Sequence, residues 1–383
     1  MSLAEIRLDD KYRVATGQFY LTGTQALTRL PMLQKQRDAA FGLNTACFIS
    51  GYRGSPLGGL DKSLWEAREY LQQNHIHFQP GVNEELGATA VWGSQQANLF
   101  PGARYDGVFA MWYGKGPGVD RCGDVFKHGN SAGVSKHGGV LLLAGDDHGC
   151  KSSTIAHQSE HAFIAASIPV LNPANVQEIL DYGIIGWELS RYSGCWVALK
   201  TIAENVDSSA VVEVDPLRVK IRIPEDFQLP EDGVHIRWPD PPLAQEKRLN
   251  QYKIYAARAF ALANDLNQIK LDSPNPRLGI ITTGKSYLDV RQALNDLGLD
   301  EELCARIGLR VLKVGMSWPL EPVSVHRFAE GLDEILVVEE KRSVIEDQLT
   351  GQLYNWPVDK RPRVVGEFDE RGNSLLPNLA ELT

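Results

Sequence analysis

Residues 157–161 read HQSEH, a spacing of histidine and acid side chains that a zinc hydrolase could use. Two histidines one helical turn apart can bind one metal ion, and a carboxylate beside them can act as general base toward metal-bound water. The stretch supplies His157, Glu160 and His161 for these roles. It lies, however, on a short connection between two predicted strands, where we expect one helix whose polar face points into a cleft. A cleft-lining role is therefore favoured, and a metal site is the alternative.

Residues 279–286 read GIITTGKS, which matches the phosphate-binding loop pattern G-x-x-x-x-G-K-S. That loop requires a strand before its first glycine and exposed backbone N–H groups between the two glycines. Here the only candidate strand is LGII, which contains Gly279 itself. The sequence therefore predicts a strand that ends in a glycine turn and opens a helix, and not a nucleotide site.

Three polar residues, Asp146, Asp147 and His148, follow the apolar run GGVLLLAG. Ligands of open α/β sheets bind at the carboxyl ends of the parallel strands, where these side chains would lie. We interpret them as candidate cleft residues. The alternative is that they only solvate a loop.

Residues 81–98 read GVNEELGATAVWGSQQAN and predict a helix that opens with two acids. Acids in the first turn are favourable near the positive end of the helix dipole, and this explains Glu85. Glu84 is different because the helix that follows it is built from small residues, which implies close packing by another element: Gly87, Ala88, Ala90, Gly93 and Ser94. Glu84 is therefore a candidate functional carboxylate.

Short apolar runs alternate with helical patterns along the chain, which is typical of parallel strands joined by crossover helices. We expect a first α/β domain over residues 1–210, with Asn172 and Pro173 opening one of its long helices. A proline-rich arm and a long helix from Leu243 to about Ile269 fill residues 211–274. A smaller α/β domain follows over residues 275–368, and residues 369–383 form a polar tail.

The composition excludes several classes of protein. The chain has 383 residues, 43% of them hydrophobic and 23% charged, which is typical of a globular protein. Its net charge of -9 and its lack of a basic stripe argue against nucleic acid as a partner. No apolar run is long enough to span a bilayer, and MSLAEIRLDDKYR does not resemble a signal peptide, so we expect a cytoplasmic protein without a membrane partner.

Four segments together resemble the pyrimidine-binding part of thiamine-diphosphate-dependent 2-oxoacid:ferredoxin oxidoreductases, in particular the indolepyruvate enzymes. They are LTGTQALTRL, GYRGSPLGGLD, VNEELGATAVWGSQQA and GDDHGCKSS. The likeness continues through RLGIITTGKSYLDVRQAL, LRVLKVGMSWPLEP and EILVVEEKRSVIEDQL, so it covers most of the chain. The resemblance implies a parallel-sheet thiamine-diphosphate-binding domain of the pyrimidine type, followed by a smaller α/β domain like the C-terminal domain of transketolase.

The resemblance also implies roles for individual residues. Glu84 matches the acid that contacts N1' of the cofactor's aminopyrimidine and shares a proton with it, which makes it the predicted catalytic residue. The loop Arg53, Gly54 and Ser55 matches the loop that meets the 2-oxo acid, although Arg53 stands where the family has proline. The remaining implied cleft residues are His157 and His161 toward the substrate, and Lys115, Asp146, Asp147 and His148 toward the cofactor.

Other parts of such an enzyme have no counterpart in this sequence. The family binds Mg²⁺ and the diphosphate with a second thiamine domain and passes electrons to ferredoxin through cysteine-ligated 4Fe-4S clusters. The five cysteines here are widely spaced and cannot form a cluster motif. We therefore expect this chain to be a portion or subunit of a larger enzyme that converts an aryl 2-oxo acid and coenzyme A into an acyl-CoA, and we expect the chain to be homodimeric and inactive alone. A non-catalytic binding module and a metallohydrolase centred on HQSEH are the alternatives.

Overall fold

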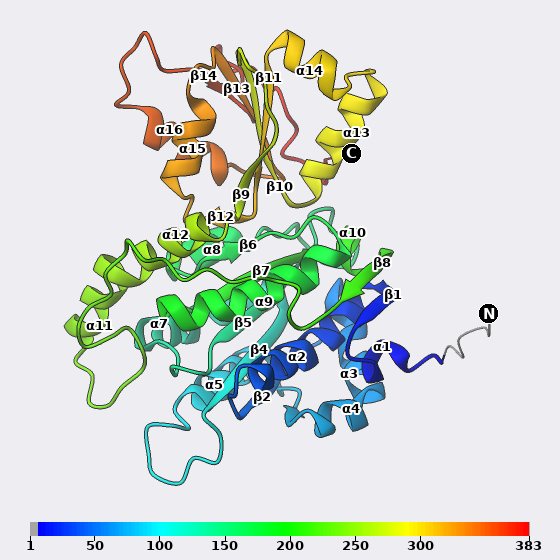
Figure 1. The fold of residues 1–383 in the computed structure, drawn as a ribbon, viewed down its shortest axis with the longest axis vertical. Coiled ribbons are helices and arrows are strands. Elements are labelled where there is room, and N and C mark those ends of the chain that lie inside the picture. Colours follow the sequence, from blue (N-terminus) through cyan, green and yellow to red (C-terminus); the bar gives the residue numbers. More distant parts are fainter. Residues whose placement is uncertain (1–6, 383) are drawn as a thin grey trace.

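The computed structural model describes residues 7–382 as two α/β units, with the smaller one seated on one side of the larger (Figure 1). The larger unit contains a seven-stranded sheet in the order β12-β6-β7-β5-β4-β2-β3. Its strands are β2 (Thr45–Gly51), β3 (Ile76–Phe78), β4 (Gly107–Lys115), β5 (Val140–Asp146), β6 (Val170–Leu171), β7 (Val197–Ile202) and β12 (Met316–Trp318). All pairs are parallel except β12 with β6. The predicted parallel α/β fold class is confirmed.

Helices cover both faces of the large sheet, because its strands are buried on both sides and carry almost continuous apolar runs. One face packs against α2 (Gly23–Ala40), α3 (Leu60–Glu66), α4 (Arg68–Gln73), α9 (Val176–Ser193) and α12 (Ile254–Ala263). The other face packs against α5 (Glu84–Gln95), α6 (Gly116–Arg121), α7 (Gly123–Ala132) and α8 (Glu160–Ala165). The remaining elements around this unit are α1 (Asp10–Arg13), η1 (Leu57–Gly59), α10 (Ala203–Val206), α11 (Pro242–Arg248), η2 (Leu249–Lys253) and the antiparallel ribbon of β1 (Gly17–Thr22) with β8 (Ser209–Val214).

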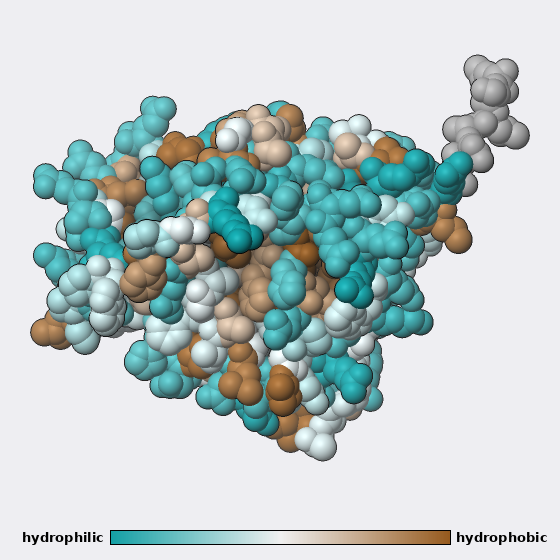
Figure 2. Space-filling model, turned by 90° about the horizontal axis from the view of Figure 1, so that it is seen from below, coloured by the Kyte–Doolittle hydropathy of each residue, from teal (hydrophilic) through white to brown (hydrophobic). Residues whose placement is uncertain are grey.

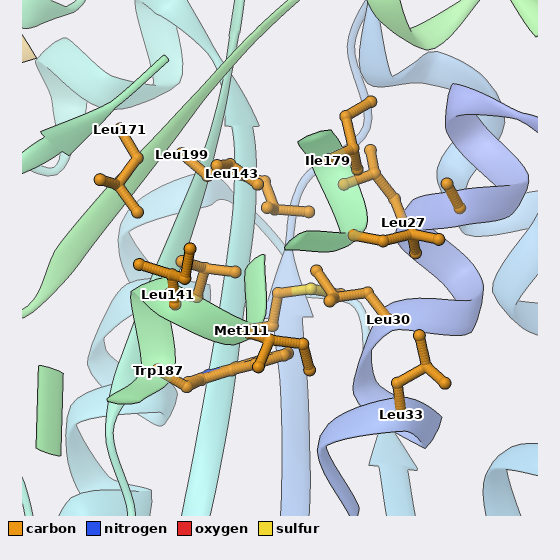
Figure 3. Close-up of a cluster of buried hydrophobic side chains, with 14 of the residues drawn as sticks. Leu27, Leu30, Leu33, Met111, Leu141, Leu143, Leu171, Ile179, Trp187 and Leu199 are labelled. Atoms are coloured by element: carbon orange, nitrogen blue, oxygen red, sulfur yellow. The ribbon is translucent and has the colours of Figure 1, made fainter. Parts of the chain in front are cut away.

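The main core lies between α2, α9 and the sheet, where leucines of α2 and the side chains of Ile179 and Trp187 of α9 meet inward-facing strand residues (Figure 3). Trp187 of α9 is fully buried there, and its Nε1 donates a hydrogen bond to the carbonyl of Ala110 at 2.9 Å. A Cβ at Gly183 would lie 2.2 Å from a Cδ of Leu30, so the two helices cross in direct contact. This packing holds the strands, and therefore the loops at their ends, in fixed positions.

The smaller unit has a five-stranded sheet in the order β14-β13-β10-β11-β9. Its strands are β9 (Asn267–Leu271), β10 (Leu278–Thr283), β11 (Leu309–Val314), β13 (Glu334–Val338) and β14 (Arg363–Val365). Figure 1 shows α13 (Gly284–Asp296) and α14 (Glu301–Ile307) on one face, and α15 (Pro322–Ala329) and α16 (Ile345–Leu353) on the other. Gly279 lies inside β10, as predicted, so GIITTGKS has no room for a phosphate loop.

Two local predictions are wrong. The helix predicted from Leu243 to about Ile269 runs instead from Pro242 to Ala263 as α11, η2 and α12, and Asn267–Leu271 form β9, because that segment pairs antiparallel with β11. The helix after β6 begins at Val176, and its N-cap is Asn175, not Asn172. The Asn175 side chain accepts a hydrogen bond from the N–H of Glu178 at 3.0 Å, which is the usual N-cap contact.

Hydrophobic side chains are exposed on the side of the larger unit that faces away from the smaller one. Figure 2 views this side and shows them gathered in its centre and lower part. Exposed apolar residues on α5 and beside it include Val82, Leu86 and Phe100. A separate finding concerns membranes: within residues 7–382, the structure contains no helix with the length and apolar character needed to cross a bilayer.

Candidate functional site

The carboxyl ends of β2, β4 and β5 lie next to one another, because these strands are neighbours in the large sheet. Each strand continues into a segment that carries predicted site residues. The loop 52–56 follows β2, helix α6 follows β4, and the loop 147–158 follows β5. The fold therefore brings together residues that are up to about a hundred positions apart in the sequence.

Glu84 is the first residue of α5, and Asn83 caps this helix by accepting a hydrogen bond from the N–H of Leu86 at 2.8 Å. Trp112 of β4 fixes the backbone here, since its Nε1 donates to the Glu84 carbonyl at 3.0 Å. The Glu84 side chain is 13% exposed, and its carboxylate pairs only loosely with Arg121, at 3.8 Å. Within residues 7–382 this carboxylate accepts no hydrogen bond. It is a mostly covered acceptor whose hydrogen-bonding capacity is unused.

Two glycines of α6 shape the surroundings of the candidate residues. A Cβ at Gly118 would lie 2.5 Å from Cγ of Glu84, and a Cβ at Gly116 would lie 2.3 Å from the ring Cγ of His157. Both positions therefore require the absence of a side chain. Helix α6 thus contacts Glu84 and His157 at positions only two residues apart.

The loop after β2 lies against the same region. Gly54 packs on Lys115, since a Cβ at Gly54 would lie 2.7 Å from the lysine Cδ. Lys115 in turn donates from Nζ to Ser153 Oγ at 3.1 Å, which joins the loop after β2 to the loop after β5. The side chains of Arg53 and Ser55 are in exposed positions and form no hydrogen bond within the described part of the chain. They are free donors at the edge of the site.

The two histidines of HQSEH point to different surroundings. His157 is buried against Gly116, with Nδ1 3.8 Å from a carboxylate oxygen of Asp120. His161 lies near Arg342 of the smaller unit, and burial followed by the charge of Arg342 lowers its pKa. The expected single helix is wrong here, because α8 begins only at Glu160. His157 thus lies at the site, whereas a substrate contact by His161 stays a prediction that no contact in the structure supports.

Asp146 and Asp147 already have partners inside the protein. Asp146 is 1% exposed and accepts hydrogen bonds from the N–H and hydroxyl of Ser159, with Nζ of Lys200 at 3.7 Å. Asp147 accepts from the N–H groups of Lys151 and Ser152 at 2.8 Å each, and so shapes the loop 147–158. Both carboxylates thus already accept hydrogen bonds from other residues of the protein. Their predicted contact with a cofactor stays a prediction.

His148 is turned toward the seam between the two units. Its Nδ1 donates to the carbonyl of His157 at 2.9 Å, and burial followed by the charge of Lys200 lowers its pKa to about 2, so the ring is neutral. A cavity of about 10 Å³, enough for roughly one water molecule, lies between His148, Glu160 and Lys200 and the 339–340 segment of the smaller unit. We name this the seam cluster: Asp146, His148, Glu160, Lys200, Glu339 and Glu340.

The residues that sequence reasoning missed are mainly those of α6. Gly116, Gly118 and Arg121 contact the candidate side chains, yet only the stretch Lys-Gly-Pro-Gly marked this segment as unusual. Two glycines around a proline indicate close approach of other groups to the backbone, but not which groups. Their partners became visible only with the fold.

The geometry at HQSEH does not support a zinc site. Glu160 forms an ion pair with Lys200 at 2.5 Å, and the two histidines face different neighbours. Within residues 7–382, no group of three or more histidine, cysteine, aspartate or glutamate side chains is arranged to hold a metal ion.

Glu84 fits the carboxylate that thiamine diphosphate requires. A ring nitrogen could contact the Glu84 carboxylate without displacing a hydrogen bond of the protein, because none is made to it by residues 7–382. The small residues Ala90 and Gly93 are exposed on the following turns of α5, and a Cβ at Gly93 would meet nothing within 4 Å. Both residues project from sides of α5 that differ from the Glu84 side, because they follow Glu84 by six and nine positions, so the open space lies where another element could pack on the helix.

Sequence comparisons find similarity to 2-oxoacid oxidoreductases. Residues 267–376 match the family model described as the indolepyruvate ferredoxin oxidoreductase middle domain. Curated relatives include indolepyruvate oxidoreductase subunit IorA of Methanothermobacter marburgensis, 28% identical over 90% of this chain and 50% of that protein. IorA of Thermococcus kodakarensis is 25% identical over 90% of this chain and 49% of its own length. The chain thus spans about half the length of these relatives.

Two solved structures share the fold. A 2-oxoglutarate:ferredoxin oxidoreductase from Magnetococcus marinus, with 2-oxoglutarate, coenzyme A and succinyl-CoA bound, superposes with a TM-score of 0.64 at 15% identity, over 91% of this chain and 62% of that one. A split gene transketolase, described as an inactive beta4 tetramer, gives a TM-score of 0.52 at 10% identity over 91% and 90% of the two chains. These solved structures show the fold, while the IorA relatives and the matched middle domain show sequence similarity to the 2-oxoacid:ferredoxin oxidoreductase family.

Proposed function

We propose that this chain supplies the pyrimidine-side half of the active site in an indolepyruvate-type oxidoreductase. The enzyme would oxidatively decarboxylate an aryl 2-oxo acid to its acyl-CoA and pass the electrons to ferredoxin. The observation that carries this proposal is Glu84, a carboxylate that is 13% exposed, held at the start of α5, and free of hydrogen bonds within residues 7–382. The IorA relatives support the substrate class.

Glu84 would hold a proton at the pyrimidine nitrogen of thiamine diphosphate. The bound cofactor supplies the group that attacks the oxo carbon and accepts the electrons released on decarboxylation. The part of Glu84 is to keep one carboxylate oxygen in a fixed position for proton sharing, with Trp112 and Gly118 fixing its backbone and side chain. Lys115 holds the neighbouring loops together and need not touch the cofactor for this role.

The 2-oxo acid would bind beside Glu84, between the loop after β2 and His157. Arg53 can offer two parallel N–H groups to the substrate carboxylate, and Ser55 can donate its hydroxyl hydrogen to an oxygen. His157, whose ring packs directly on Gly116, would lie on the opposite side of the substrate. These are the groups at the site that have donors to offer and few partners of their own.

The diphosphate-binding half of the enzyme would dock on the exposed face of α5. Leu86 is 54% exposed on that helix, and a groove of about 610 Å³ lies beside it, lined by Phe48, Ala90 and Gly93 among others. Small residues on a helix allow close approach of a partner. That half would also bring Mg²⁺ and the path to the 4Fe-4S clusters.

The first test compares Glu84→Gln with Glu85→Gln in the complete oxidoreductase. Reduction of an artificial electron acceptor is measured anaerobically with thiamine diphosphate, coenzyme A and indolepyruvate. We expect Glu84→Gln to lose at least about a hundredfold in kcat, the size of a proton-transfer contribution. Glu85→Gln changes an exposed neighbour in the same helical turn and should stay near wild type. Normal turnover by Glu84→Gln would overturn the proposal.

A further inference from the structure

Hydrogen bonds between Asp147, His148 and His157 bring the two ends of the loop 147–158 together. Its first residue, Asp147, accepts hydrogen bonds from Lys151 and Ser152 through its carboxylate and from the N–H of His157, at 3.2 Å, through its carbonyl. His148 Nδ1 donates to the His157 carbonyl at 2.9 Å. These contacts tie His157 to the first two residues of the loop through two hydrogen bonds.

The smaller unit contacts both ends of this loop through residues 340–342. Only residue 339 lies between them and the end of β13. The side-chain amide of Gln158 pairs with the backbone of Arg342. Its Nε2 donates to the Arg342 carbonyl at 2.8 Å, and its Oε1 accepts from the Arg342 N–H at 3.2 Å. At the other end, Lys341 donates from Nζ to the His148 carbonyl at 3.1 Å.

Residues 380–382, the last that the structure describes, add further contacts to the loop and to residues 340–341. Lys151 of the loop forms an ion pair with Glu381 at 2.7 Å. Glu340 accepts a hydrogen bond from the N–H of Leu382 at 3.0 Å, and Lys341 donates to the carbonyl of Ala380 at 3.3 Å. The loop is therefore held by the smaller unit directly and also through the tail.

We propose that Gln158 is a positioning residue through which the smaller unit sets the place of His157 in the substrate site. This inference rests on the proposed function. An amide that both donates to and accepts from one residue fixes distance and orientation together, whereas a single hydrogen bond fixes mainly distance. His157 follows directly, because it is the adjacent residue and its ring has no free space against Gly116. A displacement of about 1 Å at such a group can cost a large factor in rate.

The test uses Gln158→Ala and Gln158→Glu in the complete oxidoreductase, with Gln292→Ala as the matched control. Gln292 is exposed on α13 and bonds only to Asp296 on the same helix. We expect Gln158→Ala to raise KM for the 2-oxo acid about tenfold, the equivalent of one to two neutral hydrogen bonds, while affinity for thiamine diphosphate stays unchanged. Gln158→Glu keeps the acceptor for the Arg342 N–H but puts a carboxylate oxygen against the Arg342 carbonyl, so its effect should be at least as large as that of Gln158→Ala.

A second measurement separates this inference from the proposed function. Amide hydrogen exchange of residues 147–158 should become about tenfold faster in Gln158→Ala and stay unchanged in Gln292→Ala. This result does not depend on which reaction the enzyme catalyses. Unchanged exchange in Gln158→Ala would overturn the inference. So would faster exchange with an unchanged KM, or an equal loss of cofactor and substrate affinity. Failure of Glu84→Gln to lose activity would instead overturn the proposed function.

Discussion

Two clusters of polar side chains lie at the carboxyl ends of neighbouring strands, and they differ in whether their groups already have partners. Around α6, Glu84 has a carboxylate without a hydrogen bond inside residues 7–382. In the seam cluster, Asp146 and Lys200 are almost fully buried. Asp146 accepts a hydrogen bond from the N–H of Ser159, and Lys200 forms an ion pair with Glu160. The first cluster can bind a ligand at little cost, whereas the second must keep its charges paired because burial penalises any charge left alone. The same residue types thus serve a candidate site in one place and domain packing in the other.

Removal of the seam cation should have the largest effect. Lys200→Met would leave Glu160 and Asp146 buried without their counter-charge. We expect the free energy of unfolding to fall by about 3–5 kcal/mol, the cost of breaking one partner of a buried pair. Chemical denaturation measures this change. The control is Lys62→Met, which removes an exposed pair with Glu66 and should cost less than about 1 kcal/mol. Equal losses in the two variants would contradict the difference drawn between buried and exposed charges.

The seam should also make stability depend on pH. Burial raises the pKa of Glu339 to about 7, although the N–H groups of residues 344–346 partly oppose this. Its folded-state pKa lies above the ordinary value of 4.5, so its contribution is fully present below pH 4.5 and is lost as pH rises through 7. The free energy of unfolding of wild type minus Glu339→Gln should therefore fall by about 3 kcal/mol across this window.

This pH dependence has a simple control. Exposed Glu330→Gln, measured in the same denaturation series, should give a nearly flat difference from wild type. A flat or rising curve for Glu339→Gln would show that the carboxylate is not held protonated by burial.

A test of the first cluster targets space rather than charge. In Gly118→Ala the new Cβ would lie 2.5 Å from Cγ of Glu84, so the carboxylate must shift. We expect a loss of about a hundredfold in kcat/KM, about 2.7 kcal/mol, from misplacement alone. Gly123→Ala is the matched control, because a Cβ there meets nothing within 4 Å. Full activity of Gly118→Ala would mean that the position of Glu84 is unimportant.

The smallest effect is expected for Arg121. Its side chain is 57% exposed and lies 3.8 Å from the Glu84 carboxylate. Arg121→Gln should change the free energy of unfolding by less than about 0.5 kcal/mol, because exposed pairs are screened by water and salt. Thermal unfolding at low and high salt checks this. A larger change, or one independent of salt, would place Arg121 in the buried class with Lys200.

The α/β class and the place of Glu84 at the start of a helix could both be predicted from the amino-acid sequence. The period of the apolar runs is local information, and two acids ahead of a run of small residues predicted the helix that the structure has at Glu84–Gln95. The resemblance added a role for Glu84, and the loops after the strands were predicted to meet because strand ends share one edge of a sheet.

Which polar residues already have partners within the protein could not be predicted from the sequence, because it depends on the packing of distant segments. Asp146 and His148 lie at the end of β5 and in the loop that follows it, where a ligand could be expected. Their contacts are instead with Lys200 of β7 and with residues 339–341 of the smaller unit. Likewise, Asn267–Leu271 continue a helical pattern but form β9 because β11 offers a pairing edge. In each case the deciding partner is at least about forty residues away. Periodicity along the chain cannot reveal such a partner, because burial and charge pairing depend on distance in space.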